Sequence, residues 1–173
     1  EKRLDDRQLL ACARLLREIT SQTETLFIVN DRPDIALLAE ADGVHLGQDD
    51  LHVEDARRMV GSQCLIGVST HSLPQARQAI QDRADYLGCG PTFPSTTKHF
   101  ADFPGLDYLR SLRDLETPPA FAIGGIQAAN LSSVLQTGFR SIAVGNAVVD
   151  AKDPAEQVRK LNRILHSSRQ ASC

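Results

Sequence analysis

The stretch CLIGVSTHSLPQARQAIQDRADYLGCG, residues 64–90, decides the fold. Two short apolar runs, CLIGVS and ADYLGCG, flank a polar segment in which a helix is predicted to begin at Ser72. Nearly continuous hydrophobicity over so few residues is typical of parallel strands that are covered on both faces. The stretch therefore predicts a strand, a helix and a second strand of the same direction, which is the repeating unit of a parallel α/β fold.

The same alternation continues over the rest of the chain. Further apolar runs occur at residues 25–30, 43–47, 120–125 and 141–146. The first predicted helix has Asp5 and Gln8 at capping-box spacing. The last begins with Asp153 ahead of Pro154, a cap followed by a first-turn proline. The predicted apolar stripe of the first helix consists of Leu9, Ala13, Leu16 and Ile19.

Glycine or polar residues end every apolar run, and this favours a closed (β/α)8 TIM barrel over an open doubly wound sheet. A barrel delivers the carboxyl end of each strand to one mouth, whereas an open sheet concentrates its polar ends near one switch point. Only six runs are present, so we expect the first strand, the first helix and most of the second strand to precede Glu1. Residues 1–173 are predicted to form a single, N-terminally incomplete barrel domain, because no linker or low-complexity tract interrupts them.

The composition excludes some classes of function. The chain is 42% hydrophobic and 24% charged with a net charge of -3, which argues against a nucleic-acid or anionic-membrane surface. No apolar segment approaches the ~20 residues that span a bilayer. Cys64 and Cys89 lie in apolar runs, where we expect buried, reduced thiols, as suits a cytoplasmic protein.

Two aspartates follow neighbouring predicted strands. Asp31 comes directly after the run 25–30, and Asp50 follows the run 43–47. Adjacent strands lie about 4.8 Å apart, so the two carboxylates are expected to converge on one hard cation such as Mg²⁺. The alternative for each is a turn or a helix cap, and Pro33 favours capping for Asp31.

Hydroxyl and imidazole groups stand at the end of the run 64–69 and directly after it. Ser69 and Thr70 either act in the turn before the next helix or donate to an anion. His71 is a candidate general base, with a surface or packing role as the alternative. His45, inside its own apolar run, is expected to be a hydrogen-bonded interior residue.

Glycines end the last two runs. Gly124 and Gly125, and then Gly145 before Asn146 and Ala147, allow backbone amides to approach a phosphate at the usual phosphate site of a barrel. The alternative is that these glycines serve only tight turns.

The segment GCGPTFPSTTKHF, residues 88–100, combines rigid backbone with hydroxyls and the cation Lys98, which suits an anion. We expect Lys98 to reach an anion between the glycine amides and the paired carboxylates. Two anion sites point to two phosphorylated groups.

The motifs ADGVHLGQDDL, IGVSTHS, FPSTTK, AIGGI and AVGNAV, in this order, resemble the thiamine-phosphate synthase family. The resemblance implies a (β/α)8 barrel and a transferase. Family members couple hydroxymethylpyrimidine diphosphate with hydroxyethylthiazole phosphate, giving thiamine monophosphate and diphosphate. The implied partners are these small phosphorylated substrates, without nucleic acid or membrane, and the chain is compatible with a homo-oligomer.

The resemblance also assigns roles to residues. It implies that Mg²⁺ is held by Asp31 and Asp50. The leaving diphosphate is assigned to Lys2, Asn30, Ser69 and Lys98, of which Ser69 and Lys98 are the catalytic candidates. The thiazole phosphate is assigned to Ser95, Thr97, Gly125, Asn146 and Ala147. Asn146 stands where the family usually has Ser, Ser95 replaces the commoner Thr, and the family's Gln and Arg of the second strand would precede Glu1.

Two other functions remain open. A related thiazole tautomerase shares the phosphate pocket but needs acid/base chemistry, which would give His71 a role. A non-catalytic barrel that binds thiazole or thiamine phosphate is the second alternative.

Overall fold

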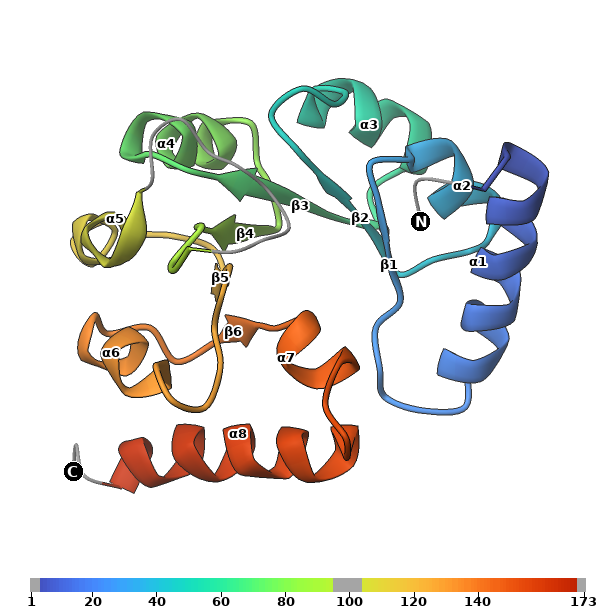
Figure 1. The fold of residues 1–173 in the computed structure, drawn as a ribbon. Helices are drawn as coiled ribbons and strands as arrows, with labels where there is room; N and C mark the ends of the chain where they lie inside the picture. Colours follow the sequence, from blue (N-terminus) through green and yellow to red (C-terminus); the bar gives the residue numbers. More distant parts are fainter. Residues whose placement is uncertain (1–3, 95–103, 171–173) are drawn as a thin grey trace. The chain divides into compact units, whose positions relative to one another are not determined.

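A computed structural model of the chain describes residues 4–94 and 104–170 and alternates strand and helix (Figure 1). Its strands are β1 (Ile28–Asn30), β2 (Gly43–Leu46), β3 (Leu65–Thr70), β4 (Tyr86–Cys89), β5 (Ala120–Ile123) and β6 (Ile142–Ala143). Its helices are α1 (Asp6–Thr20), α2 (Pro33–Leu38), α3 (Val53–Val60), α4 (Leu73–Gln81), α5 (Gly105–Ser111), α6 (Leu131–Gln136), α7 (Asn146–Val149) and α8 (Pro154–Gln170). Each of the six apolar runs contains a strand, as predicted.

The strands follow chain order in one sheet, β1-β2-β3-β4-β5-β6. The pairs β1–β2, β2–β3, β4–β5 and β5–β6 are parallel. The expected closed barrel of eight strands is wrong for this chain, because the described residues supply six strands and the order begins at β1 and ends at β6. The parallel α/β class is confirmed, and the closure of the sheet is corrected.

Internal contacts divide the chain into two compact units. Unit 1 comprises Glu1–Ser69 and Gln78–Tyr86, and unit 2 comprises Thr70–Arg77 and Leu87–Cys173. The boundary falls inside β3 and inside β4. The prediction of a single domain is not tested by this division and stays a prediction.

Unit 1 packs α2 on β1 and β2, and α3 lies beside α2 (Figure 1). The strands and helices contribute fully buried apolar side chains, namely Val44, Leu46, Ile66, Ala36 and Ala56. The register pairs Asn30 with His45 and Leu46 with Val68. Neighbouring strand ends therefore lie next to one another at the carboxyl edge of this unit.

Helix α1 begins as predicted, with the complete capping box of Asp5 and Gln8. Its apolar stripe is a different matter. Ala13 is buried, whereas Leu16 and Ile19 are 43% and 57% exposed. The predicted apolar stripe of α1 is therefore only partly buried against the other described residues.

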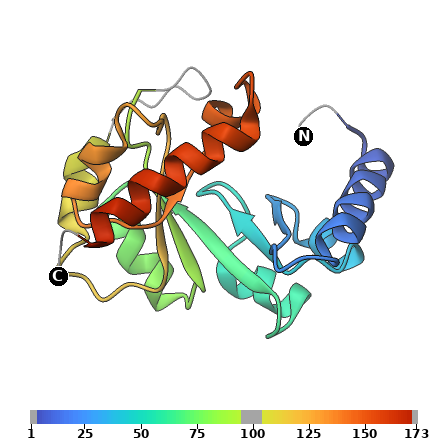
Figure 2. The same cartoon turned by 90° about the horizontal axis from the view of Figure 1, so that it is seen from below.

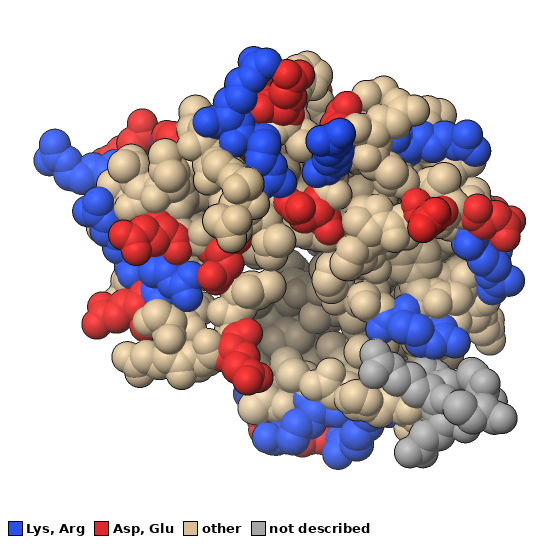
Figure 3. Space-filling model, turned by 180° about the vertical axis from the view of Figure 1, so that it is seen from behind, with Lys and Arg blue, Asp and Glu red and all other residues tan. Residues whose placement is uncertain are grey.

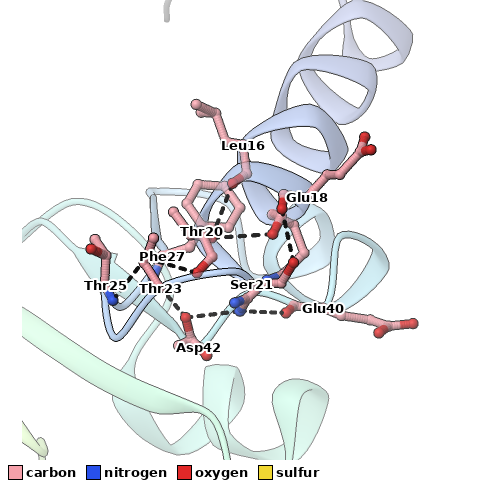
Figure 4. A network of polar contacts seen from close by, with 10 residues as sticks. Leu16, Glu18, Thr20, Ser21, Thr23, Thr25, Phe27, Glu40 and Asp42 are labelled. Carbon is pink, nitrogen blue, oxygen red and sulfur yellow. Dashed lines mark hydrogen bonds and ion pairs between the residues drawn. The ribbon is translucent and has the colours of Figure 1, made fainter.

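The amino end of β1 and β2 is fixed by Asp42 (Figure 4). Its Oδ2 accepts the Phe27 amide at 2.6 Å and pairs with Nη1 of Arg17 at 2.8 Å. The hydrogen bond from Phe27, and then the Arg17 guanidinium, hold the pKa of the Asp42 carboxyl below its ordinary value. The carboxylate thus ties α1 to the start of the sheet.

Asp85 repeats this device at the start of β4. Its Oδ2 accepts the Ile66 amide at 2.7 Å and pairs with Nη2 of Arg57, on α3, at 2.5 Å. Asp42 and Asp85 both follow an alanine and both stand directly before a strand. A carboxylate paired with a helix arginine is therefore a repeated feature of unit 1.

Unit 2 packs α8 against both α6 and α7 (Figure 2). The Asp153 side chain accepts the Glu156 amide at 2.9 Å, which confirms the predicted cap of α8. Leu109, Leu131 and Val134 are fully buried, and Leu161 brings α8 into this core.

Positive and negative side chains are interspersed on the face seen in Figure 3. In the described part of the chain, no helix is both long and apolar enough to cross a membrane. Cys89 is buried as predicted, whereas Cys64 is only partly buried, and both are unpaired thiols.

Candidate active site

Asn30 ends β1 in unit 1, and Asp31 follows it directly. Asp31 donates its amide to the carbonyl of His45 at 2.8 Å and has a φ of 64°. The left-handed region is tolerated by aspartate better than by most residues. Helix α2 begins at Pro33, and its cap residue is Arg32. The capping explanation for Asp31 is therefore wrong, and its exposed side chain stands at the strand end.

Asp50 follows β2 and stabilises a tight turn. Its Oδ2 accepts the Gly47 amide at 2.6 Å. Helix α3 begins at Val53 with His52 as its cap residue, so Asp50 is a turn residue and no helix cap. Since β1 and β2 are parallel neighbours, Asp31 and Asp50 both come after strand ends at the same edge of the sheet in unit 1. Over residues 4–94 and 104–170, no cluster of three or more His, Cys, Asp or Glu side chains is placed to hold a metal.

Ser69 belongs to a row of hydrogen-bonded side chains in unit 1. Nε2 of His45 lies 2.9 Å from Oγ of Ser69, and Nδ1 of His45 lies 3.1 Å from the Tyr86 hydroxyl. The expectation that His45 is hydrogen-bonded is confirmed, whereas its position is only partly buried. Gln48 donates from Nε2 to the Ser69 carbonyl at 2.6 Å, which holds the strand end from the neighbouring loop.

Tyr86 was not predicted from the sequence as part of this site. Its ring lies over Gly67, where an added methyl group would stand 2.0 Å from Cζ of Tyr86. The ring centroids of Tyr86 and His45 are 5.4 Å apart. Burial raises the pKa of Tyr86 to about 12. The signal that was available is the glycine in IGVS, since a glycine inside a strand often marks a close approach.

In unit 2, the end of β3 is tied to β4. The buried Thr70 hydroxyl donates to the Gly88 carbonyl at 3.2 Å and accepts from the Tyr108 hydroxyl at 2.7 Å. Thr70 thus has a structural role. Nδ1 of His71 lies 2.6 Å from the Gly90 carbonyl. Because a carbonyl only accepts, Nδ1 carries the proton of the neutral ring and Nε2 carries the lone pair.

Gly124 and Gly125 bring the start of the 88–100 segment onto the end of β5. Their φ values are 97° and 64°. An added methyl group at Gly125 would lie 2.8 Å from the Phe93 carbonyl oxygen, and Phe93 donates its amide to the Gly124 carbonyl at 3.0 Å. Positive φ and close packing therefore both require glycine here, and the phosphate role of Gly125 stays a prediction.

Gly145 precedes the short helix α7. In the first hydrogen bond of this helix, the Val148 amide donates to the Gly145 carbonyl at 2.8 Å. The amides of Asn146 and Ala147 come before it, at positions that an α-helix leaves without intrahelical acceptors. A methyl group at Gly145 would meet nothing within 4 Å. Asn146 and Ala147 therefore stand at an open strand-to-helix turn.

Four predicted site residues lie outside the described residues, namely Lys2, Ser95, Thr97 and Lys98. The described site residues fall into two groups. Asn30, Asp31, Asp50 and Ser69 belong to unit 1, and Gly125, Asn146 and Ala147 belong to unit 2.

Comparison with known proteins gives consistent matches. The family model described as thiamine monophosphate synthase matches residues 1–148. A thiamine-phosphate synthase of Chloroflexus aurantiacus is 48% identical over 95% of this chain and 76% of its own length. A thiamine-phosphate synthase of Rhodopirellula baltica is 47% identical, but the 84% of this chain that matches spans only 40% of that protein. A solved structure of a thiamine phosphate pyrophosphorylase from Pyrococcus furiosus has a TM-score of 0.87 at 36% identity, covering 97% of this chain and 81% of that one.

Proposed function

The chain belongs to the thiamine monophosphate synthase family, and we propose that its strand ends carry out the synthesis of thiamine phosphate from a pyrimidine diphosphate and a thiazole phosphate. The observation that carries the proposal is the gathering of Asn30, Asp31, Asp50 and Ser69 at the carboxyl ends of β1, β2 and β3. Polar groups at one edge of a parallel sheet are typical of a ligand site.

The proposed metal ligands are Asp31 and Asp50. Two carboxylates suit Mg²⁺, which keeps several waters and takes substrate phosphate oxygens into its shell. The donor set therefore fits this ion. Asp50 uses Oδ2 to hold the Gly47 turn, so Oδ1 would be its ligand atom. When bound, Mg²⁺ would neutralise charge on the leaving diphosphate.

The proposed contacts of the diphosphate are donors and cations. Ser69 donates its hydroxyl proton and Asn30 its amide protons, while Lys2 and Lys98 contribute positive charge. The bond between the pyrimidine methylene carbon and the diphosphate oxygen breaks, and its electron pair leaves with the diphosphate. The thiazole nitrogen then donates its lone pair to the resulting carbocation. Since no protein nucleophile takes part, these residues act by orientation and electrostatic stabilisation.

The thiazole phosphate is assigned to unit 2. Amides of Gly125, Asn146 and Ala147, with the hydroxyls of Ser95 and Thr97, are the proposed donors. The positive φ of Gly125 and the open turn at Gly145 support this assignment. Backbone amides at such turns are common phosphate ligands.

Isomerisation of a thiazole carboxylate phosphate is the second candidate function. It is favoured by His71, whose Nδ1 is engaged by the Gly90 carbonyl so that Nε2 is the basic nitrogen. Acid/base chemistry of this kind needs no diphosphate and no Mg²⁺.

The deciding experiment supplies the protein with both substrates and measures thiamine phosphate and pyrophosphate release, with Mg²⁺ or with excess chelator. The synthase proposal expects equal amounts of both products and loss of both with chelator. Turnover that survives chelation contradicts the metal assignment. Conversion of a thiazole carboxylate phosphate without pyrophosphate release would instead establish the isomerase.

The unpaired thiols Cys12, Cys64 and Cys89 suit a reducing compartment, and we propose a cytoplasmic location on this ground.

A further inference from the structure

We propose that Tyr86 is a positioning residue that sets the tautomer of His45 and thereby makes the Ser69 hydroxyl a donor to the leaving diphosphate. The inference rests on the proposed function of Ser69. It concerns unit 1 alone, to which all three residues belong.

The three side chains lie on one face of the sheet. His45 is the register partner of Gly67, and Ser69 follows two residues later on the same face. The Tyr86 ring occupies the space above Gly67 that any side chain would fill. This arrangement produces the row of contacts from the Tyr86 hydroxyl through Nδ1 and Nε2 of His45 to Oγ of Ser69.

The row has two proton arrangements. In the first, Tyr86 donates to Nδ1, Nε2 carries the imidazole proton and donates to Ser69, and the Ser69 proton is directed to another acceptor. In the second, Nδ1 carries the imidazole proton and donates to the Tyr86 oxygen, and the Ser69 hydroxyl donates to Nε2. A neutral imidazole has one donor and one acceptor nitrogen, so these are the two arrangements that a neutral His45 allows within this row.

The first arrangement is favoured by the chemistry of the groups. The phenol keeps its proton in both arrangements, because burial disfavours its anion. A phenol hydroxyl is a stronger donor and a weaker acceptor than an alcohol hydroxyl, so Tyr86 pairs better with the unprotonated nitrogen of His45 and Ser69 with the protonated one. A hydroxyl that donates to an anion forms a short, charge-assisted hydrogen bond. Only the first arrangement leaves the Ser69 proton for that purpose, while Gln48 holds the Ser69 carbonyl.

The direct test reads the tautomer of His45 by ¹⁵N NMR at about pH 8, where an ordinary histidine is neutral. We expect a pyrrole-type Nε2 and a pyridine-type Nδ1 in the wild-type protein. Tyr86→Phe keeps the ring above Gly67 and removes only the hydroxyl, so the two tautomers should become mixed. Tyr108→Phe is the matched control, because it removes a buried hydroxyl that bonds to Thr70 and leaves His45 unchanged. A protonated Nδ1 in the wild-type protein overturns the proposal.

The functional test measures binding of inorganic pyrophosphate in the presence of Mg²⁺ by calorimetry. Tyr86→Phe and Ser69→Ala are each expected to weaken binding about tenfold, since each removes the oriented donor. The double variant should bind like Ser69→Ala alone, because Tyr86 acts through Ser69. Independent, multiplying effects overturn the proposal.

The two tests separate failure of this inference from failure of the proposed function. If Ser69→Ala binds pyrophosphate as the wild type does, the diphosphate role of Ser69 is wrong, and with it the functional part of the inference. The NMR result then still decides whether Tyr86 sets the tautomer.

Discussion

Asp31 has a backbone φ of 64°, and its side chain is a proposed ligand of Mg²⁺. Asparagine tolerates the left-handed region as aspartate does, whereas alanine tolerates it less well. Asp31→Asn should therefore introduce no backbone strain and reduce Mg²⁺-dependent turnover by about 100-fold, as expected for loss of a metal contact. Asp31→Ala should lose the same activity and also about 1 kcal/mol of stability. Product formation and urea unfolding measure the two effects.

The matched control for Asp31 is Asp49→Asn. Asp49 is exposed and lies in the same polar loop as Asp50. Asp49→Asn removes one negative charge from this loop, and so tests whether loss of any nearby negative charge is enough to lower turnover. If Asp49→Asn lowers turnover as much as Asp31→Asn does, the specific metal assignment is wrong.

Gly67 and Tyr86 are expected to be energetically coupled. A methyl group at Gly67 would stand 2.0 Å from the Tyr86 ring, so Gly67→Ala should destabilise the protein by about 1–3 kcal/mol through overpacking. In a Tyr86→Ala background the same substitution should cost little, since the ring is gone. A double-mutant cycle by urea unfolding measures the coupling. Additive effects would show that the close approach does not limit stability.

The sequence allowed the positions of Asp31, Asp50 and Ser69 to be predicted, because each stands at the end of an apolar run or shortly after it. It did not reveal Tyr86. The contact of Tyr86 with Gly67 depends on how separate strands are aligned, which no local pattern specifies. The hydrogen bonding of His45 was expected, but its partners follow from the same alignment.

At the scale of elements, Asp42 links α1 to the first two strands, and its pKa is lowered by the Phe27 amide and then by Arg17. A carboxyl whose pKa is lower in the folded protein stabilises it above the unfolded-state pKa, and this contribution is lost as the pH falls through the folded-state value. Asp42→Asn keeps an acceptor for Phe27 but removes the charge. It should cost about 1 kcal/mol at pH 7, and this cost should shrink as the pH falls below the ordinary aspartate pKa of about 3.9.

Urea unfolding of wild type and Asp42→Asn across this pH range provides the measurement. Asp49→Asn serves again as control, because Asp49 is an exposed aspartate outside this network. A difference between wild type and Asp42→Asn that stays constant down to pH 2 would contradict the electrostatic explanation.

The same network explains why the first strand is shorter than its apolar run. The run 25–30 predicted a strand, but β1 begins at Ile28. Phe27 donates its amide to the Asp42 carboxylate, and Leu26 is 60% exposed. Hydrophobicity marks residues that favour a strand, but a side chain distant in sequence determines where the ladder starts.

At the scale of the whole molecule, the prediction of six parallel strands was correct and the prediction of a closed barrel was wrong. Polar strand ends were the argument for closure. Parallel strands joined by helices bring their carboxyl ends to one edge whether or not the sheet closes. Polar strand ends therefore identify the edge of the sheet that carries the chemistry, but they do not show whether the sheet closes. Closure of this barrel takes eight strands, and the described sheet has six.

The assignment of one phosphorylated group to each unit predicts separate footprints in hydrogen exchange. Pyrophosphate with Mg²⁺ should slow amide exchange at the β1, β2 and β3 ends of unit 1, around Asp31, Gly47 and Ser69. Hydroxyethylthiazole phosphate should slow exchange around Gly125 and Asn146 in unit 2. Each ligand immobilises the turns that hold it, because exchange of a loop amide reports the local opening free energy.

Mass spectrometry of peptides from the exchanged protein resolves these footprints, with Mg²⁺ alone and inorganic sulfate as the controls. Sulfate tests whether any dianion protects the unit 2 turns, and Mg²⁺ alone separates metal binding from diphosphate binding. Amides at the amino end, such as Phe27 beside Asp42, should exchange at an unchanged rate with either ligand, since they belong to the structural network. Protection of the turns at Gly125 and Asn146 by pyrophosphate, with none at Asp31, would reverse the assignment. The two groups of strand ends would then have exchanged roles, and Asp31 and Asp50 would have to be explained as turn residues alone.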